Sequence, residues 1–425
     1  MARLVMKFGG TSVGDTARIR RVARHIKREW DAGHEVCAVI SAMAGETNRL
    51  IALTAEIAAL HDAREYDSVI ASGEQVSAGL VALALQTLGV PARSWLGWQI
   101  PIRTTGVHGA ARIKEIEGKE IDLRLKGAEG RERQVAVVAG FQGLGPDERL
   151  TTLGRGAGDL TAVAMAAALN ADRCDIYTDV TGVFTTDPRI VEKARKLDRI
   201  SYEEMLEMSS LGAKVLQSRS VELAMVHGVR LQVLSSFLEP EQIPALDAKN
   251  ISKVPGTLVC DEDEIVEQLV VSGIAYSRDE AKVTVRHVPD RPGVAAEIFG
   301  CLSDANINVD MIVQNISEEN KTTDITFTVG KGDLKRTLDA LKPAIEKMPR
   351  TSIVSDDRVA KISIIGVGMR SHTGIARTMF ETLGEKGINI QVISTSEIKV
   401  SVLIDAEYTE LAVRALHAAY GLDAT

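Results

Sequence analysis

The first 236 residues or so alternate between short apolar runs and helix-length segments, and this alternation limits the fold more than any other feature of the sequence. Such alternation is typical of a layered α/β domain, in which helices cover a central sheet. We expect strands at residues 4–6, 36–40, 92–96, 135–141, 174–178 and 230–235. We expect helices at residues 16–30, 72–88, 158–168, 202–208 and 213–227.

Length and composition narrow the class of protein. At 425 residues the chain is longer than one hydrophobic core usually supports, so two or three domains are expected. The hydrophobic content of 45%, the charged content of 25% and the net charge of -8 indicate a soluble cytoplasmic protein with neither nucleic acid nor a membrane as partner. The four cysteines are scattered, so neither a zinc site nor a disulfide framework is indicated.

The second half of the chain contains an internal duplication. Residues 237–267 are rich in proline and acidic side chains, which predicts a linker with a short strand at residues 257–260. Beyond it, Gly293 and Asn308 recur as Gly374 and Asn389, about 80 residues later. Each copy has the pattern strand, turn, helix, strand, strand, helix. The turn before the helix in each copy either caps that helix or offers its N–H groups to a small ligand's carboxylate.

A lysine beside paired glycines follows the first expected strand. In the run Lys7-Phe8-Gly9-Gly10, glycine lets backbone N–H groups approach a phosphate, and the lysine and the next helix supply positive charge. This arrangement predicts phosphoryl transfer. Because the lysine precedes the glycines, the run is not the GxxxxGK[ST] loop. A Gly-Gly turn taken alone is equally typical of ordinary turn chemistry.

Four further segments carry polar or glycine-rich patterns at strand ends. They are residues 40–43, which contain Ser41, residues 72–77, which contain Glu74, the glycine-rich loop 152–159, and residues 177–189. Ligands of open α/β sheets gather at strand ends, so we expect these segments to converge. Each residue alone also fits an ordinary turn, a solvated charge or a first-turn helix acid.

Together these motifs resemble those of the amino acid kinase family, and within it the aspartate kinases with two regulatory ACT domains. The resemblance rests on KFGGTSVG, SAM, SGE, TTLGRGAGD, YTDVTGVFTTDPRI, EEMLEMSSLGAKVL and the duplicated tail, in that order. It implies a three-layer α/β/α kinase domain at residues 1–240, a linker at 241–265, and two ferredoxin-like (βαββαβ) ACT domains at 266–345 and 346–425. The implied reaction moves the γ-phosphoryl group of ATP to the β-carboxylate of L-aspartate. It gives 4-phospho-L-aspartate and ADP, at the first step toward lysine, threonine and methionine.

The chemistry assigns roles to several residues. A carboxylate is already ionised near neutral pH and needs no general base, so catalysis reduces to alignment and neutralisation of charge. We assign that neutralisation to Lys7 with the Gly9 and Gly10 amides. Arg155 suits a substrate carboxylate and Glu74 suits the substrate ammonium group.

The resemblance supplies the remaining assignments. Asp159 is implied to orient Lys7 or the substrate ammonium. The implied substrate contacts are Thr47, Glu74, Arg155, Gly158 and Asp159. The implied ATP contacts are Lys7, Phe8, Gly9, Gly10, Ser41, Thr178, Asp179, Phe184, Asp187, Arg189 and Lys214. Magnesium is expected on the ATP phosphates, without a protein cage.

Two positions depart from the family pattern. Gly158 stands where many relatives carry serine, so a hydroxyl expected near the substrate is absent. Phe184 stands where relatives often carry tyrosine, which keeps the ring and removes a donor. Neither change removes a charge that the mechanism needs.

The ACT resemblance implies feedback control by lysine and threonine, alone or together. The implied effector contacts are Asp290, Gly293, Val294, Ala295, Asp310, Gln314, Asn389 and Ile390. Unpaired strand edges predict a homo-oligomer or a complex with a chain matching only the regulatory tail. Two alternatives remain open: a kinase of the same fold acting on glutamate, acetylglutamate, carbamate or UMP, and a catalytically silent amino-acid sensor.

Overall fold

The chain forms two compact units. The computed structural model describes residues 1–58, 60–154, 156–212, 215–243, 255–265, 270–317, 322–348 and 350–423. The first unit comprises Met1–Val183, Lys196–Ser209 and Lys214–Val266. The second comprises Phe184–Arg195, Ser210–Ala213 and Glu267–Thr425. Two short segments that precede residue 214 therefore belong to the second unit.

An eight-stranded sheet forms the centre of the first unit, in the order β10-β12-β11-β9-β1-β2-β6-β3. Its strands are β1 (Arg3–Phe8), β2 (Glu35–Ile40), β3 (Ala92–Trp95), β6 (Val135–Ala139), β9 (Arg173–Thr178), β10 (Arg199–Ser201), β11 (Leu231–Ser235) and β12 (Thr257–Cys260). All neighbouring strands are parallel except β11 and β12. All six residues of β2 are buried, as expected for a strand covered on both faces.

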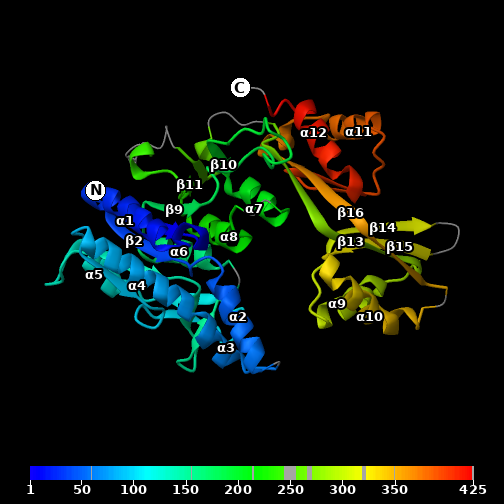
Figure 1. Ribbon diagram of the computed structural model, residues 1–425. Helices are drawn as coiled ribbons and strands as arrows, with labels where there is room; N and C mark the ends of the chain where they lie inside the picture. The colour runs from blue at the N-terminus through cyan, green and yellow to red at the C-terminus, as the bar shows by residue number, and fades with distance from the viewer. Residues whose placement is uncertain are drawn as a thin grey trace. The chain divides into compact units, whose positions relative to one another are not determined.

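Helices cover both faces of this sheet, which confirms the three-layer α/β/α fold (Figure 1). The helices of the unit are α1 (Thr16–Asp31), α2 (Glu46–Ile57), α3 (Ala63–Ile70), α4 (Ser72–Thr87), α5 (Lys119–Lys126), α6 (Gly158–Ala168), α7 (Tyr202–Ser210) and α8 (Ser218–His227). One core contains residues of α1 and α4 with alternate residues of β1, β2 and β6. Helix α6 contacts β1, β2 and β9. A small second sheet, β5-β4-β7-β8, contains β4 (Ile102–Thr104), β5 (Ile113–Ile116), β7 (Gln142–Leu144) and β8 (Leu150–Thr152).

The strands expected in the first 236 residues are all present, with bounds that differ by at most two residues. The helix expected from residue 213 begins instead at Ser218, because Gln217 before it is extended. The strand expected at residues 257–260 is β12, which lies within the predicted linker and pairs with β10 and β11. Residues 244–254 of that linker lie outside the described part of the chain.

One helical stretch of the described chain, Ala63–Thr87, is long and apolar enough to cross a membrane by length and composition alone. Half of its most apolar window is buried inside the protein. The α4 part contributes Ala78, Val81 and Leu85 to the core against the sheet. A core helix passes the same test, so this stretch is weak evidence for a membrane span.

The second unit has one antiparallel sheet that both repeats share, in the order β14-β15-β13-β16-β18-β17. Its strands are β13 (Gly273–Pro289), β14 (Asp310–Ser317), β15 (Thr322–Val329), β16 (Ser352–Ile365), β17 (Val392–Thr395) and β18 (Lys399–Asp405). Its helices are α9 (Val294–Asp304), α10 (Leu334–Ile345), α11 (Ile375–Glu385) and α12 (Thr409–Ala419). Figure 1 shows α9 beside α10, and α11 beside α12.

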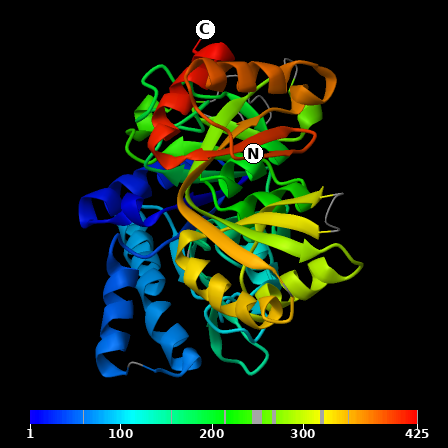
Figure 2. The ribbon, with the colours of Figure 1, turned by 90° about the vertical axis from the view of Figure 1, so that its right-hand side faces the viewer.

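The two long strands β13 and β16 are exchanged between the repeats. Residues 282–286 of β13 pair with residues 352–356 of β16 in the first repeat, whereas residues 273–277 pair with residues 361–365 in the second. Figure 2 shows β16, in orange, running from one pair of helices to the other. The second repeat therefore uses a strand segment that precedes the first repeat in sequence. The predicted ranges 266–345 and 346–425 do not include this exchange.

A buried ion cluster holds the shared sheet where the repeats meet. Lys361 on β16 lies 2.7 Å from the Glu280 carboxylate on β13 and also pairs with Asp310 on β14. Lys361 and Glu280 are nearly inaccessible to solvent, with exposed fractions of 4% and 7%. Buried charges are tolerated only when they are paired, so Lys361 and Glu280 depend on each other, whereas the Asp310 side chain is more than half exposed.

We predict that Lys361→Met lowers the free energy of unfolding of the second unit by about 3–5 kcal/mol, because Glu280 would be left buried without a counter-charge. The matched control is Lys342→Met, which removes an exposed pair with Asp339 and should change stability little. Urea titration followed by circular dichroism measures both variants. Equal midpoints for the two variants would contradict the prediction.

Candidate active site

Lys7 and Asp159 form an ion pair at the centre of the first unit. Lys7 lies near the end of β1, between β2 and β9, and Asp159 lies in the first turn of α6. The Lys7 Nζ and Asp159 Oδ1 atoms are 2.6 Å apart, and the two side chains are about one-tenth exposed. A charge pair this close and this buried fixes the position of the lysine ammonium.

The glycines after Lys7 pack against the turn that follows β2. A Cβ atom on Gly10 would lie 2.8 Å from the Ala42 carbonyl oxygen, so only glycine fits there without a backbone shift. The Ala44 N–H donates to the Gly10 carbonyl at 3.1 Å, and the Ser41 N–H donates to the Phe8 carbonyl at 3.1 Å. The two turns are therefore held together.

One cavity of about 500 Å³ lies at the carboxyl end of β1 and is lined by residues from the expected loops. The predicted site residues that line it are Lys7, Gly10, Ser41, Thr47, Glu74 and Gly158. The loop 152–159 contributes Thr152, Gly154, Gly156 and Ala157 as well. Three of the four expected segments, residues 40–43, 72–77 and 152–159, thus meet the Lys7 turn at this cavity, whereas residues 177–189 are not among those that line it.

Glu74 lines this cavity and has one carboxylate oxygen without a hydrogen-bond partner among the described residues. It lies in the first turn of α4, is only 5% exposed, and its Oε1 accepts a hydrogen bond from the Ala42 N–H at 3.1 Å. Its Oε2 is buried and has no hydrogen-bond partner among the residues that the structure describes. Burial raises the pKa of the Glu74 carboxyl to about 7, against the opposing effect of the Ala42 N–H. Such an oxygen fits a cationic ligand group.

Gly158 packs closely against Ser41 and Lys7. A Cβ atom at this position would lie 2.8 Å from the Ser41 Oγ and 3.3 Å from the Lys7 Cε. A serine here would require the Ser41 hydroxyl to turn away. In this chain, glycine keeps Ser41 and Lys7 in their present positions.

The other predicted residues of the first unit have different surroundings. The Phe8 side chain is buried and stacks on Tyr177 at 4.6 Å between ring centroids, so only its backbone is available to a ligand. Thr178 ends β9 beside β1, and its hydroxyl donates to Asp179 at 3.2 Å. Arg155 and Lys214 lie outside the described residues.

Asp187 and Arg189 belong to the second unit. The Arg189 guanidinium donates to the Asp187 carboxylate at 2.8 Å, and this hydrogen bond holds the pKa of Asp187 below its usual value. The Tyr276 hydroxyl of β13 donates to the same carboxylate at 3.1 Å. Phe184, at the start of this segment, is half-buried.

Some of the predicted effector residues are exposed to solvent, whereas others are buried or already paired with another side chain. Val294 is buried in the core of the first repeat, whereas Asp290 and Gly293 are exposed and Ala295 is half-buried. Burial alone would raise the pKa of Asp310, but its hydrogen bond and charge contact with Lys361 hold that pKa below the usual value. A small core joins β14 of the first repeat to β17 and β18 of the second. Gln314 lies on β14, and Asn389 and Ile390 come shortly before β17, so these predicted residues lie on neighbouring segments.

Several residues of the site were not expected from the sequence. Tyr66 and Ile70 line the cavity from α3, and their spacing of four residues on an apolar helix face is the signal that marks them. Phe141, which follows β6, also lines the cavity. Its backbone φ of 69° is one that residues other than glycine rarely adopt. No sequence pattern marks Phe141.

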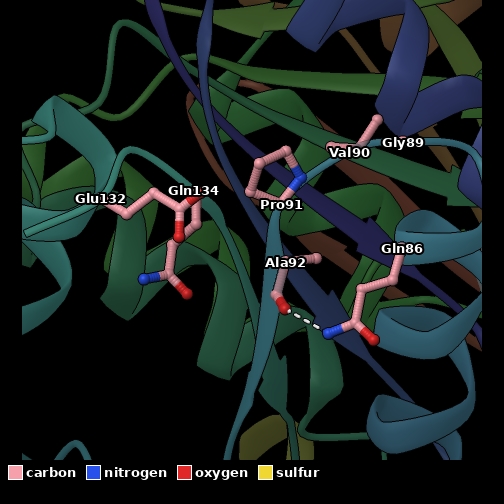
Figure 3. Close-up of a pocket in the computed structure, with 7 residues that line it drawn as sticks. All are labelled: Gln86, Gly89, Val90, Pro91, Ala92, Glu132 and Gln134. Atoms are coloured by element: carbon pink, nitrogen blue, oxygen red, sulfur yellow. Dashed lines mark hydrogen bonds between the residues drawn. The ribbon is translucent and has the colours of Figure 1, made fainter.

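A second hollow, of about 280 Å³, lies at the opposite edge of the sheet. Figure 3 shows its lining, where the Gln86 side chain donates to the Ala92 carbonyl at 2.9 Å. It is lined by Gln86, Gly89, Val90, Pro91, Ala92, Glu132 and Gln134. None of the described residues that line this hollow is a lysine or an arginine, so they offer no positive charge for a phosphate group.

Comparison with known proteins places these features in a family. A model of the amino acid kinase family matches residues 2–235, and two ACT domain models match residues 283–346 and 362–420. An aspartate kinase of Stutzerimonas stutzeri is 52% identical, and the alignment covers 100% of this chain and 98% of that protein. An aspartokinase of Mycolicibacterium smegmatis is 46% identical over 99% of this chain and 97% of that protein.

Solved structures give the same result. The chain superposes on Escherichia coli aspartokinase III in complex with aspartate and ADP, in its R-state, with a TM-score of 0.79 and 27% identity over 98% of this chain and 99% of that one. The T-state of the same enzyme, in complex with lysine and aspartate, gives a TM-score of 0.73 with 27% identity, covering 98% of each chain.

We predict that Glu74→Gln stabilises the ligand-free protein at pH 8 more than at pH 5. The pKa of Glu74 in the folded protein, about 7, lies above its unfolded value of 4.5. The protonated Glu74 of the wild type therefore contributes its full stability below pH 4.5, and this contribution is lost as the pH rises through 7. The difference between variant and wild type should grow by about 3 kcal/mol over that range. Chemical denaturation at both pH values measures it.

The control for this experiment is Glu56→Gln, which removes an exposed carboxylate on α2. Its effect should be the same at both pH values. A Glu74→Gln variant whose stability follows that of Glu56→Gln would contradict the prediction.

Proposed function

Because the chain belongs to the aspartate kinases of the amino acid kinase family, we propose that the cavity at the end of β1 is where the γ-phosphoryl group of MgATP passes to the β-carboxylate of L-aspartate. A bond forms between a carboxylate oxygen and the γ-phosphorus, and the bond from that phosphorus to the β-phosphate oxygen breaks. The products are 4-phospho-L-aspartate and ADP. The observation that carries the proposal is that one cavity is lined both by Lys7 and by Glu74, whose buried Oε2 has no hydrogen-bond partner among the described residues.

Lys7 neutralises the charge that spreads over the transferred phosphoryl group. The attacking carboxylate is already ionised, so the protein supplies alignment and positive charge rather than a base. Asp159 holds the ammonium in place through the 2.6 Å contact. Gly10 lines the cavity and is proposed to add its N–H group, whereas the Gly9 N–H already donates to the Tyr177 carbonyl at 3.3 Å. In a site largely closed to water, such fixed charges act more strongly than in solution.

Glu74 binds the substrate ammonium group. Its unsatisfied oxygen gains a charged hydrogen bond when an amino acid enters, which offsets the cost of burying the carboxylate. Since the pKa of Glu74 is about 7 in the ligand-free protein, aspartate should bind more tightly as the pH rises from 6 to 8. Thr47 lies on the same cavity wall, and Arg155 is proposed to clamp a carboxylate of the substrate.

The nucleotide is proposed to lie toward β9, where Thr178 and Asp179 follow the strand beside Lys7. Arg189 and Lys214 are proposed to reach its phosphates. No group of three or more His, Cys, Asp or Glu in the described part of the chain is arranged to hold a metal ion. Magnesium therefore fits as part of the substrate MgATP, held by phosphate oxygens and water.

The second unit is proposed to carry feedback inhibition by lysine and threonine. The ACT domain matches and the T-state structure of a relative in complex with lysine support this assignment. Asp187 and Arg189, the proposed nucleotide contacts, belong to this unit and are tied to it by Tyr276. An effector that binds one arrangement of the repeats better than another can thereby act on the nucleotide contacts. The edges of the shared sheet suit a homo-oligomer or a partner chain with the same repeats.

The test of the reaction is acyl phosphate formation from MgATP, trapped with hydroxylamine, with aspartate compared against glutamate. We predict aspartate-selective product, and a loss of about 100- to 1,000-fold in kcat for Lys7→Met, because one charged donor to the transferring group is removed. The control Lys126→Met removes an exposed ion pair with Asp122 on α5 and should retain the wild-type rate.

Two results would reject this proposal. One is equal product from glutamate, which would indicate another acceptor. The other is a Lys7→Met variant that keeps the wild-type rate, or a folded wild-type protein that binds ATP without forming product, as a silent sensor would.

We predict that lysine and threonine together suppress the rate more than either alone, and that Tyr276→Phe raises the effector concentration for half-inhibition by about 2- to 30-fold. The variant removes the hydroxyl that links β13 to Asp187. Tyr408→Phe, at an exposed position of the second unit, is the control. The measurement is rate against effector concentration. Inhibition curves that coincide for wild type and Tyr276→Phe would rule out this link.

A further inference from the structure

A fully buried carboxylate, Asp67, lies beneath the wall of the active-site cavity. It belongs to α3, and the core around it is apolar, with Leu50, Ile70, Leu153 and Ala157 among its members. An isolated charge would be costly in such surroundings, so a carboxylate persists there only if its oxygens accept enough hydrogen bonds. None of the roles assigned so far uses this side chain.

Three residues from two distant segments donate to Asp67. Its Oδ2 accepts from the His108 Nδ1 at 2.8 Å and from the Thr152 N–H at 3.0 Å. Its Oδ1 accepts from the Thr152 hydroxyl at 2.6 Å, and the Gly109 N–H lies 3.1 Å from both oxygens. Both oxygens are therefore saturated by donors, and the side chain bonds to residues that are 41 to 85 positions away in sequence.

These donors belong to the walls of the cavity. Gly109 and Thr152 both line it, and the Ala111 N–H donates to the Thr152 carbonyl at 2.9 Å, which ties the two segments to each other. Thr152 ends β8 and begins the loop that reaches Gly158 and Asp159 at the start of α6. Asp67 holds the beginning of this loop, and the Lys7 ion pair holds its end.

We propose that Asp67 is a positioning residue for phosphoryl transfer, which sets the 108–109 turn and the 152–159 loop at the spacing that the amino-acid substrate requires. This proposal rests on the proposed function of the cavity. Asp67 is too deeply buried to touch the substrate, and its action passes through Gly109 and Thr152. A displacement of about 1 Å in such supporting groups is enough to lower a rate by up to about 100-fold.

The first test is Asp67→Asn, compared with Glu65→Gln on the same helix. Asparagine keeps the shape but turns an NH2 group toward the donors of Gly109, His108 or Thr152. We expect kcat/KM for aspartate to fall by about 10- to 100-fold through a higher KM, while KM for MgATP changes by less than about twofold. Glu65 is largely exposed and pairs with Arg149, so its variant should keep the wild-type constants.

A second pair of variants covers the case in which Asp67→Asn does not fold. Thr152→Val removes the hydroxyl that donates at 2.6 Å and keeps the backbone donor, and Thr152→Ser restores the hydroxyl. We expect Thr152→Val to raise KM for aspartate and Thr152→Ser to recover most of the loss. Equal constants for the valine and serine variants would overturn the proposal, as would a folded Asp67→Asn variant that is less stable but kinetically unchanged.

Amide hydrogen exchange separates this proposal from the proposed function. We expect faster exchange in residues 105–112 and 150–154 of Asp67→Asn than of Glu65→Gln, whether or not the protein forms aspartyl phosphate. If the wild type lacks aspartate activity and the two variants still differ in exchange in this way, the proposed function is rejected. Asp67 then remains the support of the loop. Unchanged exchange in both segments would overturn the positioning role itself.

Discussion

The buried ion pair between Lys7 and Asp159 is the interaction on which the rest of the site depends. Parallel pairing places Lys7 opposite Val39 of β2 and Ile176 of β9, so the lysine is carried by the most constrained strand of the sheet. Asp159 reaches it from α6, and a Cβ atom on Gly158 would lie 2.8 Å from the Ser41 Oγ and 3.3 Å from the Lys7 Cε. Two largely buried charges each require the other, so the lysine is already oriented for the phosphoryl group that the proposed function assigns to it.

Much of this arrangement follows from sequence because its signals are local. Buried parallel strands are continuous apolar runs, so β2 and β6 were predictable to within two residues, and strand ends of such sheets gather loops. The exchange of β13 between repeats was not predictable, because an apolar pattern identifies a strand but not its partner. The short strands β4, β7 and β8 carry too few residues to show a period. Asp67 is a single acidic residue on a helix, a position at which most acids are solvated.

The segment at residues 184–195 shows why the boundary between catalysis and regulation cannot be placed at one point in the sequence. Its Thr185 carbonyl accepts from the Ile274 N–H at 2.7 Å, and the Thr185 hydroxyl bonds to His417 of α12 at 2.9 Å. Ile190 and Val191 pack against the core of the second repeat. The proposed nucleotide contacts are thus part of the unit that carries the ACT repeats. Under the proposed function, a rearrangement within that unit would displace these contacts directly.

The contrast between Asp67 and Glu74 gives a physical criterion for separating support from recognition in this site. Both carboxylates are buried beside the same cavity, and burial imposes a similar cost on each. Asp67 has both oxygens saturated by protein donors, so it can hold a loop but has nothing left for a ligand. Glu74 leaves one oxygen without a protein donor, and burial raises its pKa to about 7. That unmet interaction makes the ligand-free protein less stable at neutral pH, and under the proposed function a substrate ammonium group would remove this deficit on binding.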